Sequence, residues 1–317
     1  MRTFVIVLFT ALLHGLGTHS LVTSPYYSSP RGVDNVAGPD GFERRLFYDD
    51  FSGRPVGSLP SPSKWHLDLG TSYPGGPENW GTGEVQTYTN SRRNIEITAR
   101  NTLQITPQRA KNGSWTSARI ETTAPWDFAC QRGQRLRVEA RLKLGDGPMS
   151  KQLGIWPAFW ALGSDYRGDY WNWPAVGEID ILESVNGESK AWHVVHCGVA
   201  PGGPCKEFSG ISNATDHVRR GVWHTLSWEV DRRNAYLGES MSWFVDGRRE
   251  WTLKESDVGD DDAWKALAGN KKMVLLNVAV GGSFPDAIAG FKTPTGKTVG
   301  GNEASLEVDY VAVYSSK

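Results

Sequence analysis

The sequence predicts an all-β chain that folds as a two-sheet β-sandwich, or jelly roll. Two observations predict this class. Short apolar or alternating runs recur from about residue 45 to the end of the chain, and turn residues separate them. Only Asp260–Ala268, which begins with acidic residues, has a helical pattern of any length. Strands that follow one another without intervening helices bury their apolar faces by packing two sheets together.

The individual strands follow from the same patterns. Leu136–Leu144 alternates apolar residues with Arg, Glu or Lys, as a half-buried strand does. Asp246-Gly247 lies between two apolar runs and predicts a hairpin. In chain order, the expected strands are Leu46–Phe51, Glu84–Thr89, Asn94–Thr98, Leu103–Gln108, Leu136–Leu144, Gly154–Leu162, Val176–Glu183, Lys190–Cys197, Trp223–Val230, Met241–Val245, Met273–Val280 and Leu306–Tyr314.

The N-terminal segment has the pattern of a targeting signal. Residues 1–20 carry Arg2, then an apolar run, then small and polar residues, which is typical of a secretory signal peptide cleaved near Ser20. Residues 21–39 are rich in Ser, Pro and Gly and are expected to form a leader or linker, and residues 40–317 one domain. No later apolar run is long enough to span a membrane. We therefore expect a secreted, extracellular protein without a membrane anchor.

Composition and cysteine spacing narrow the class further. Lys and Arg number 34 against 35 Asp and Glu, without a basic block, so no nucleic-acid partner is predicted. We also expect the protein to be a monomer. Cys197 and Cys205 flank a loop rich in Gly and Pro that is flexible enough for a disulfide. Cys130 is then left as a buried thiol. Asn112-Gly-Ser and Asn213-Ala-Thr are predicted glycosylation sites in a secreted chain.

Residues 178–183 read Glu-Ile-Asp-Ile-Leu-Glu and place three carboxylates in one apolar stretch. In a regular strand, Glu178 and Asp180 share one face and Glu183 takes the other. A β-bulge after Asp180 returns Glu183 to the first face. The two Glu carboxyls then approach the separation of about 5–5.5 Å of a retaining glycosidase. The alternative is a solvated strand, but like charges on one face repel one another unless something uses them.

Tryptophan is frequent, with 14 residues in the chain, and several lie near the acids. An indole offers a flat apolar face and a hydrogen-bond donor, which suits the C–H faces of sugar rings. Trp156 and Trp160 lie at even spacing in one strand and share a face, and Trp173 leads into the acidic stretch. All three are candidate sugar platforms, although the shared face of Trp156 and Trp160 can also be core.

These motifs together resemble glycoside hydrolase family 16, in particular its bulged laminarinase-like branch and the fungal secreted members. The resemblance rests on Trp156-Pro-x-x-Trp160, Glu178-x-Asp180-x-x-Glu183 and a following strand with His196, and it extends over about residues 45–314. It implies a concanavalin A-like jelly roll with a concave substrate cleft. It also implies an endo-acting enzyme that cleaves β-1,3- or mixed β-1,3/1,4-glucan without a cofactor.

The resemblance assigns roles that the chemistry of carboxyl groups supports. Glu178 is expected to be the nucleophile, and Glu183 the general acid and then the base. The negative charges of Glu178 and Asp180 are expected to raise the pKa of Glu183. Asp180 is expected to hold Glu178 through a shared proton. His196 is expected to hydrogen-bond the acid–base or the sugar, whereas His193 points to the opposite face.

Other residues match family positions more loosely. Asn79, Trp80 and Glu84 are expected on the donor side of the cleft, and Arg119 and Asn277 along it. A structural calcium on the convex face is expected at Asp50 and Asp309, because carboxylate oxygens suit that cation.

Other functions fit the same motifs. A non-catalytic β-glucan-binding sandwich keeps the fold but loses the nucleophile or the acid, and both are present here. A transglycosylase shares the first half-reaction, so the sequence does not separate it from a hydrolase. Galactan-type substrates are a further alternative.

Overall fold

The structure is a computed structural model that describes residues 38–234 and 238–317. The predicted signal peptide and all but the last two residues of the predicted leader lie outside the described residues. The described residues belong to one compact unit. Within them, no helix combines the length and apolar composition that crossing a membrane requires.

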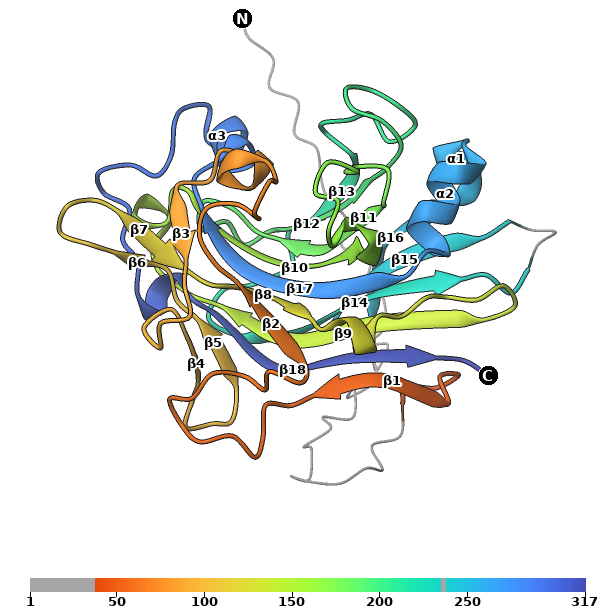
Figure 1. The fold of residues 1–317 in the computed structure, drawn as a ribbon, viewed down its shortest axis with the longest axis horizontal. Coiled ribbons are helices and arrows are strands. Elements are labelled where there is room, and N and C mark those ends of the chain that lie inside the picture. The colour runs from red at the N-terminus through yellow and green to blue at the C-terminus, as the bar shows by residue number, and fades with distance from the viewer. Residues whose placement is uncertain (1–37, 235–237) are drawn as a thin grey trace, which may run out of the picture. The chain divides into compact units, whose positions relative to one another are not determined.

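Two large antiparallel sheets form this unit, as the strand pattern predicts (Figure 1). The first has eight strands, in spatial order β16 (Arg248–Lys254), β15 (Ser240–Val245), β14 (Trp223–Asp231), β9 (Arg135–Leu144), β18 (Leu306–Ser315), β5 (Leu103–Ile105) and β4 (Ile95–Ile97), with β1 (Arg44–Asp49) also paired to β18. The second has seven, in the order β13 (Ile211–Thr215), β12 (Ala191–His196), β11 (Glu178–Glu183), β10 (Ile155–Gly163), β17 (Lys272–Val280), β8 (Arg119–Thr122) and β2 (Trp65–Asp68).

Smaller elements complete the fold. A third sheet joins β3 (Gln86–Tyr88), β7 (Trp115–Ser117) and β6 (Gln108–Arg109). The helices are α1 (Glu255–Val258), α2 (Asp261–Ala268) and α3 (Ser283–Ala289), with single 3₁₀ turns at Glu78–Gly81, Ala124–Trp126, Met149–Lys151, Ser164–Tyr166 and Asn302–Ala304. The predicted helix corresponds to α2, where the Asp260 carboxylate accepts a hydrogen bond from the Ala263 amide at 2.8 Å. This acidic stretch is therefore a capped helix start.

The apolar core lies between the two large sheets, and strand alternation decides which side chains reach it. On β10, Ile155 and Phe159 are buried in the core, whereas Trp156 and Trp160 lie on the outer face of the seven-stranded sheet and stay partly exposed. On β12, His193 is buried with Val195, and His196 lies on the outer face. The outer face of the seven-stranded sheet thus carries the predicted site residues of these strands.

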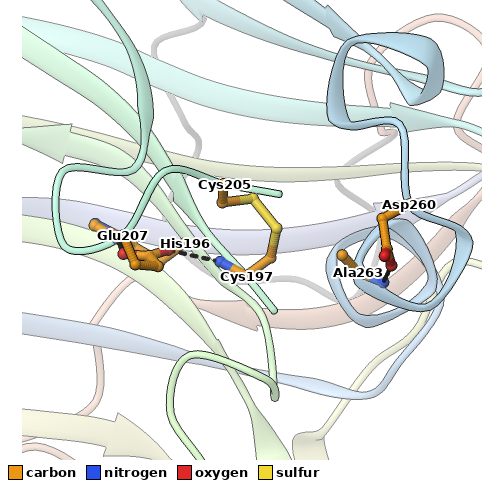
Figure 2. Close-up of a disulfide and its surroundings, with 6 residues drawn as sticks. All are labelled: His196, Cys197, Cys205, Glu207, Asp260 and Ala263. Atoms are coloured by element: carbon orange, nitrogen blue, oxygen red, sulfur yellow. Dashed lines mark hydrogen bonds and ion pairs between the residues drawn. A yellow bond between two sulfur atoms is a disulfide. The ribbon is translucent and has the colours of Figure 1, made fainter. Parts of the chain in front are cut away.

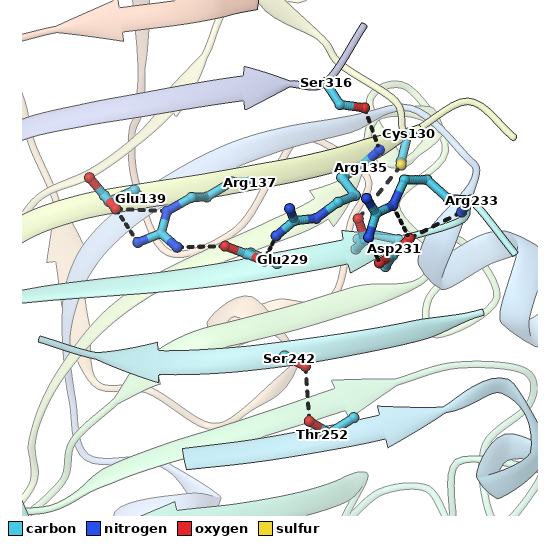
Figure 3. A network of polar contacts seen from close by, with 11 residues as sticks. Cys130, Arg135, Arg137, Glu139, Glu229, Asp231, Arg233, Ser242, Thr252 and Ser316 are labelled. Carbon is cyan, nitrogen blue, oxygen red and sulfur yellow. Dashed lines mark hydrogen bonds and ion pairs between the residues drawn. The ribbon is translucent and has the colours of Figure 1, made fainter. Parts of the chain in front are cut away.

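The outer face of the eight-stranded sheet carries a ladder of ion pairs (Figure 3). Arg135 and Arg137 on β9 each lie 2.6 Å from a Glu229 oxygen on β14, and Arg137 also pairs with Glu139. The hydroxyl of Tyr310 donates to Glu139 at 2.6 Å. Charges on neighbouring strands therefore neutralise one another across this face.

Candidate active site

The acidic strand β11 contains the predicted bulge. Opposite β10, Phe159 pairs with Leu182 and Trp160 pairs with Asp180, so Ile181 has no partner. The register with β12 also shifts between Asp180 and Glu183. Ile181 and Leu182 both enter the core, which returns Glu183 to the face of Glu178 and Asp180. One extra residue thus brings three carboxylates onto the outer face of the seven-stranded sheet.

Aromatic and imidazole groups surround these acids. The indole Nε1 of Trp156 donates to Glu183 Oε1 at 2.9 Å, and the side chain of Trp173 hydrogen-bonds Glu178. His196 Nε2 lies 3.8 Å from Asp180 Oδ2 and 4.0 Å from Glu178 Oε1. Asp180 and Glu183 are buried and Glu178 partly buried. The site is therefore a cluster of desolvated carboxyls with one imidazole beside them.

Burial is the main cause of the pKa shifts in this cluster. It raises the pKa of Glu183 to about 7, with help from the charge of Glu178 and against His196 and the Trp156 hydrogen bond. Burial and the charges of Glu183 and Glu178 raise the pKa of Asp180 well above its ordinary value. Burial also raises the pKa of Glu178, but His196, Arg119 and Trp173 oppose the rise. Burial is therefore a larger cause than the neighbouring charge that the sequence predicts.

Arg119 connects two of the predicted tryptophans. Its guanidinium carbon lies 4.7 Å from the ring centroid of Trp80 and 4.9 Å from that of Trp160, within cation–π range. Arg119 Nε also donates to Asp68 Oδ2 at 3.0 Å. Asn79, beside Trp80, is exposed. Arg119 therefore holds two aromatic rings on the same face of the seven-stranded sheet.

Glu84 and Asn277 are buried, and they belong to a chain of hydrogen bonds beneath Trp160. Trp160 Nε1 donates to Asn277 Oδ1 at 2.8 Å, and Asn277 Nδ2 donates to the Tyr88 hydroxyl at 3.2 Å. Tyr88 in turn donates to Glu84 Oε2 at 2.9 Å. Tyr88, which the sequence reasoning did not select, therefore links two predicted residues that support the surface through Trp160.

Glu207 and Phe208 were also missed by the sequence reasoning. Glu207 Oε2 lies 2.7 Å from His196 Nδ1, and the exposed ring of Phe208 stacks on Trp173 with centroids 6.3 Å apart. Their position just after Cys205, next to a loop expected to be closed by a disulfide, was the available signal. Cys197 and Cys205 form that disulfide, as predicted (Figure 2). Cys130 is a buried free thiol, also as predicted.

The predicted calcium and glycan residues have contacts or exposure of their own. Asp309 Oδ2 lies 2.7 Å from Arg141 Nη1, and Asp50 accepts hydrogen bonds from Ser52; calcium binding at these two acids stays a prediction. Within the described residues, the one group of three close metal-type ligands is Glu178, Asp180 and His196. Asn112 and Asn213 are exposed, and their glycosylation stays a prediction.

Comparisons with known proteins identify relatives of this chain. A family model described as an XgeA-like, catalytic GH16 domain matches residues 87–215. The solved structure of an endo-1,3-β-glucanase from Streptomyces sioyaensis is 44% identical, covers 88% of this chain and 98% of that chain, and has a TM-score of 0.81. Glucan endo-1,3-β-glucosidase A1 of Niallia circulans is 28% identical over 86% of this chain and 38% of its own length. Keratan-sulfate endo-1,4-β-galactosidase of Sphingobacterium multivorum is 30% identical over 56% of this chain and 36% of its own length. The chain thus spans little more than a third of these two curated relatives.

Proposed function

The chain belongs to glycoside hydrolase family 16, and we propose that it is a secreted, monomeric, endo-acting hydrolase that cleaves β-1,3- or mixed β-1,3/1,4-glucan with retention of configuration. The bulge at Ile181 carries the proposal, because it gathers Glu178, Asp180 and Glu183 on one face. The names of the Streptomyces and Niallia relatives support the glucan substrate. The signal-like residues 1–20 support secretion.

In this proposal Glu183 is the general acid. A pKa of about 7 keeps its carboxyl protonated in mildly acidic solution, ready to protonate the leaving oxygen. Glu178 attacks the anomeric carbon and forms a covalent glycosyl-enzyme. Forming that ester removes the Glu178 charge, which is one of the causes of the raised pKa of Glu183. Glu183, ionised once it has protonated the leaving oxygen, then acts as the base that takes a proton from water. The water oxygen attacks the anomeric carbon, breaks its bond to Glu178 and releases the sugar.

Asp180 has a supporting role between the two reacting acids. Burial and the charges of Glu183 and Glu178 raise its pKa well above the ordinary value, which favours a neutral Asp180 beside an ionised Glu178. A neutral Asp180 adds no third charge to the cluster and offers a proton to its neighbours. This arrangement is the one expected when three desolvated carboxyls share one surface.

Two other activities share either the first reaction step or the fold. A glycosyl-enzyme can pass its sugar to another sugar instead of water, which makes the enzyme a transglycosylase. A β-glucan-binding protein on the same fold binds without cleavage. The presence of both Glu178 and Glu183, with the pKa of Glu183 raised, favours cleavage over binding alone.

The test compares wild type and Glu178→Gln on laminarin, lichenan, agarose and xyloglucan, and follows product size and anomeric configuration by NMR. We expect wild type to shorten laminarin or lichenan internally and to release β-configured ends first, and Glu178→Gln to be inactive. Products longer than the substrate identify transglycosylation. Binding without cleavage, cleavage of agarose alone, or an α-configured first product overturns the proposal.

A further inference from the structure

The loop that follows β12 brings a buried carboxylate against His196. The side chain of Glu207 has no solvent exposure. Its Oε1 accepts a hydrogen bond from the Cys197 amide at 2.9 Å, and its Oε2 lies 2.7 Å from His196 Nδ1 (Figure 2). A buried carboxylate is costly unless it is paired and hydrogen-bonded, so this arrangement is specific.

The hydrogen bond to Glu207 determines which ring nitrogen of His196 carries a hydrogen and which faces the acids. A carboxylate accepts only, so Nδ1 of His196 carries the hydrogen and Nε2 faces the acids. Nε2 lies 3.8 Å from Asp180 Oδ2 and 4.0 Å from Glu178 Oε1. Burial lowers the pKa of His196, but the Glu207 hydrogen bond and the charges of Glu178, Glu207 and Glu183 outweigh it, and the net pKa is raised.

The disulfide fixes both members of this pair. Cys197 directly follows His196, Glu207 lies two residues after Cys205, and both cysteines are fully buried. The loop between them is tight. Gly203 has φ +65°, and a Cβ there would lie 2.6 Å from the Val199 carbonyl oxygen. The disulfide thus joins the two ends of the loop, next to His196 at one end and Glu207 at the other.

We propose that Glu207 is a positioning residue, which holds His196 with Nε2 against Glu178 and Asp180 and acts on the reaction only through that imidazole. The inference rests on the proposed function. The positive imidazolium opposes the rise in pKa of both Glu178 and Glu183, so it favours the ionised nucleophile. Glu178, Asp180 and Glu183 on β11 and Glu207 in the loop are the titratable groups that bear on it.

The main variant is Glu207→Gln, which keeps the size of the side chain and an acceptor for the Cys197 amide but loses the charge. We expect kcat to fall about 10- to 100-fold, the range known for outer partners of metal-bound histidines, with KM little changed. In a His196→Gln background, adding Glu207→Gln should have no further effect on kcat. The matched control is Glu307→Gln, a buried carboxylate bonded to Arg100 and Lys143 on the other sheet, which should leave kcat unchanged.

A second readout does not depend on turnover. In ¹⁵N NMR, His196 of the wild type should carry its neutral-form proton on Nδ1, and its pKa should fall in Glu207→Gln. An unchanged His196 titration, an unchanged kcat in folded Glu207→Gln, or full additivity with His196→Gln overturns the positioning role. If the wild type cleaves none of the glucans, the proposed function fails, and the NMR titration still decides the role of Glu207.

Discussion

Glu183 is a carboxyl group whose surroundings favour its neutral form, and this has a consequence for stability. Its pKa is raised from 4.5 in an unfolded chain to about 7 in the fold. Between these values the unfolded chain has released the proton while the folded chain keeps it. The free energy of unfolding therefore falls as pH rises from about 4.5 to 7, and the whole penalty is present above that range.

Glu183→Gln removes this penalty together with the general acid. We expect the variant to be more stable than wild type at pH 8, by on the order of 1–3 kcal/mol, and of similar stability at pH 4. Its kcat should fall by about 10²- to 10⁴-fold. Urea unfolding at both pH values and steady-state kinetics measure the two effects. Equal stability of the two proteins at pH 8 would contradict the burial of an ionisable Glu183.

Trp156 tunes the same acid through one hydrogen bond. Trp156→Phe keeps an aromatic ring but loses the donor to Glu183 Oε1, a bond that lowers the pKa of Glu183. We expect the alkaline limb of the kcat/KM profile to move to higher pH. Trp160→Phe is the matched control, because its lost bond goes to Asn277 and not to an acid. A limb that moves equally in both variants, or in neither, argues against this role.

At the scale of elements, the start of β11 depends on its contact with a helix. Gly177 directly precedes Glu178 and has φ +76°, and a Cβ there would lie 2.6 Å from the Ala266 carbonyl oxygen in α2. A left-handed conformation favours glycine at this position, and the helix backbone leaves no room for a side chain. The position of the nucleophile is therefore fixed by packing of α2 as well as by the sheet.

Gly177→Ala tests this contact. Gly168→Ala is the control, because Gly168 also has positive φ but a Cβ at that position would meet no atom within 4 Å. Backbone strain should lower the free energy of unfolding of both variants by about 1 kcal/mol, and the clash should lower that of Gly177→Ala by about 2 kcal/mol more. Only Gly177→Ala should also lose activity. Urea unfolding and kcat/KM measure both, and equal losses in the two variants would contradict the contact.

The elements that the sequence predicts are those with enough length for periodicity. Each of the twelve expected strands overlaps a strand of the structure, and the expected helix is α2. The strands that were missed are short or carry polar residues. In β8, Arg119 and Glu121 are buried polar residues that break the apolar pattern, and β13 exposes Ser212 and Asn213. Tertiary partners, which sequence periodicity does not contain, stabilise these strands.

At the scale of the whole molecule, the site joins residues far apart in the chain. The bulge was predictable, because the spacing of Glu178, Asp180 and Glu183 is useful only if one residue is skipped. The contact of Glu207 with His196 was not, because no local pattern specifies a hydrogen bond across a loop. Likewise, only the folded sheet brings Arg119 over the rings of Trp80 and Trp160.

The central claim is that Glu178 forms a covalent bond to the sugar on a face it shares with Glu183. In the direct measurement, the enzyme is treated with 2-deoxy-2-fluoro-laminaribiosyl fluoride, which slows release of the covalent intermediate. Peptide mass spectrometry then locates the added mass. The account predicts one label, on Glu178, that disappears when an acceptor sugar is added. A label on Glu183 or Asp180, or none in an enzyme that cleaves laminarin, would contradict it.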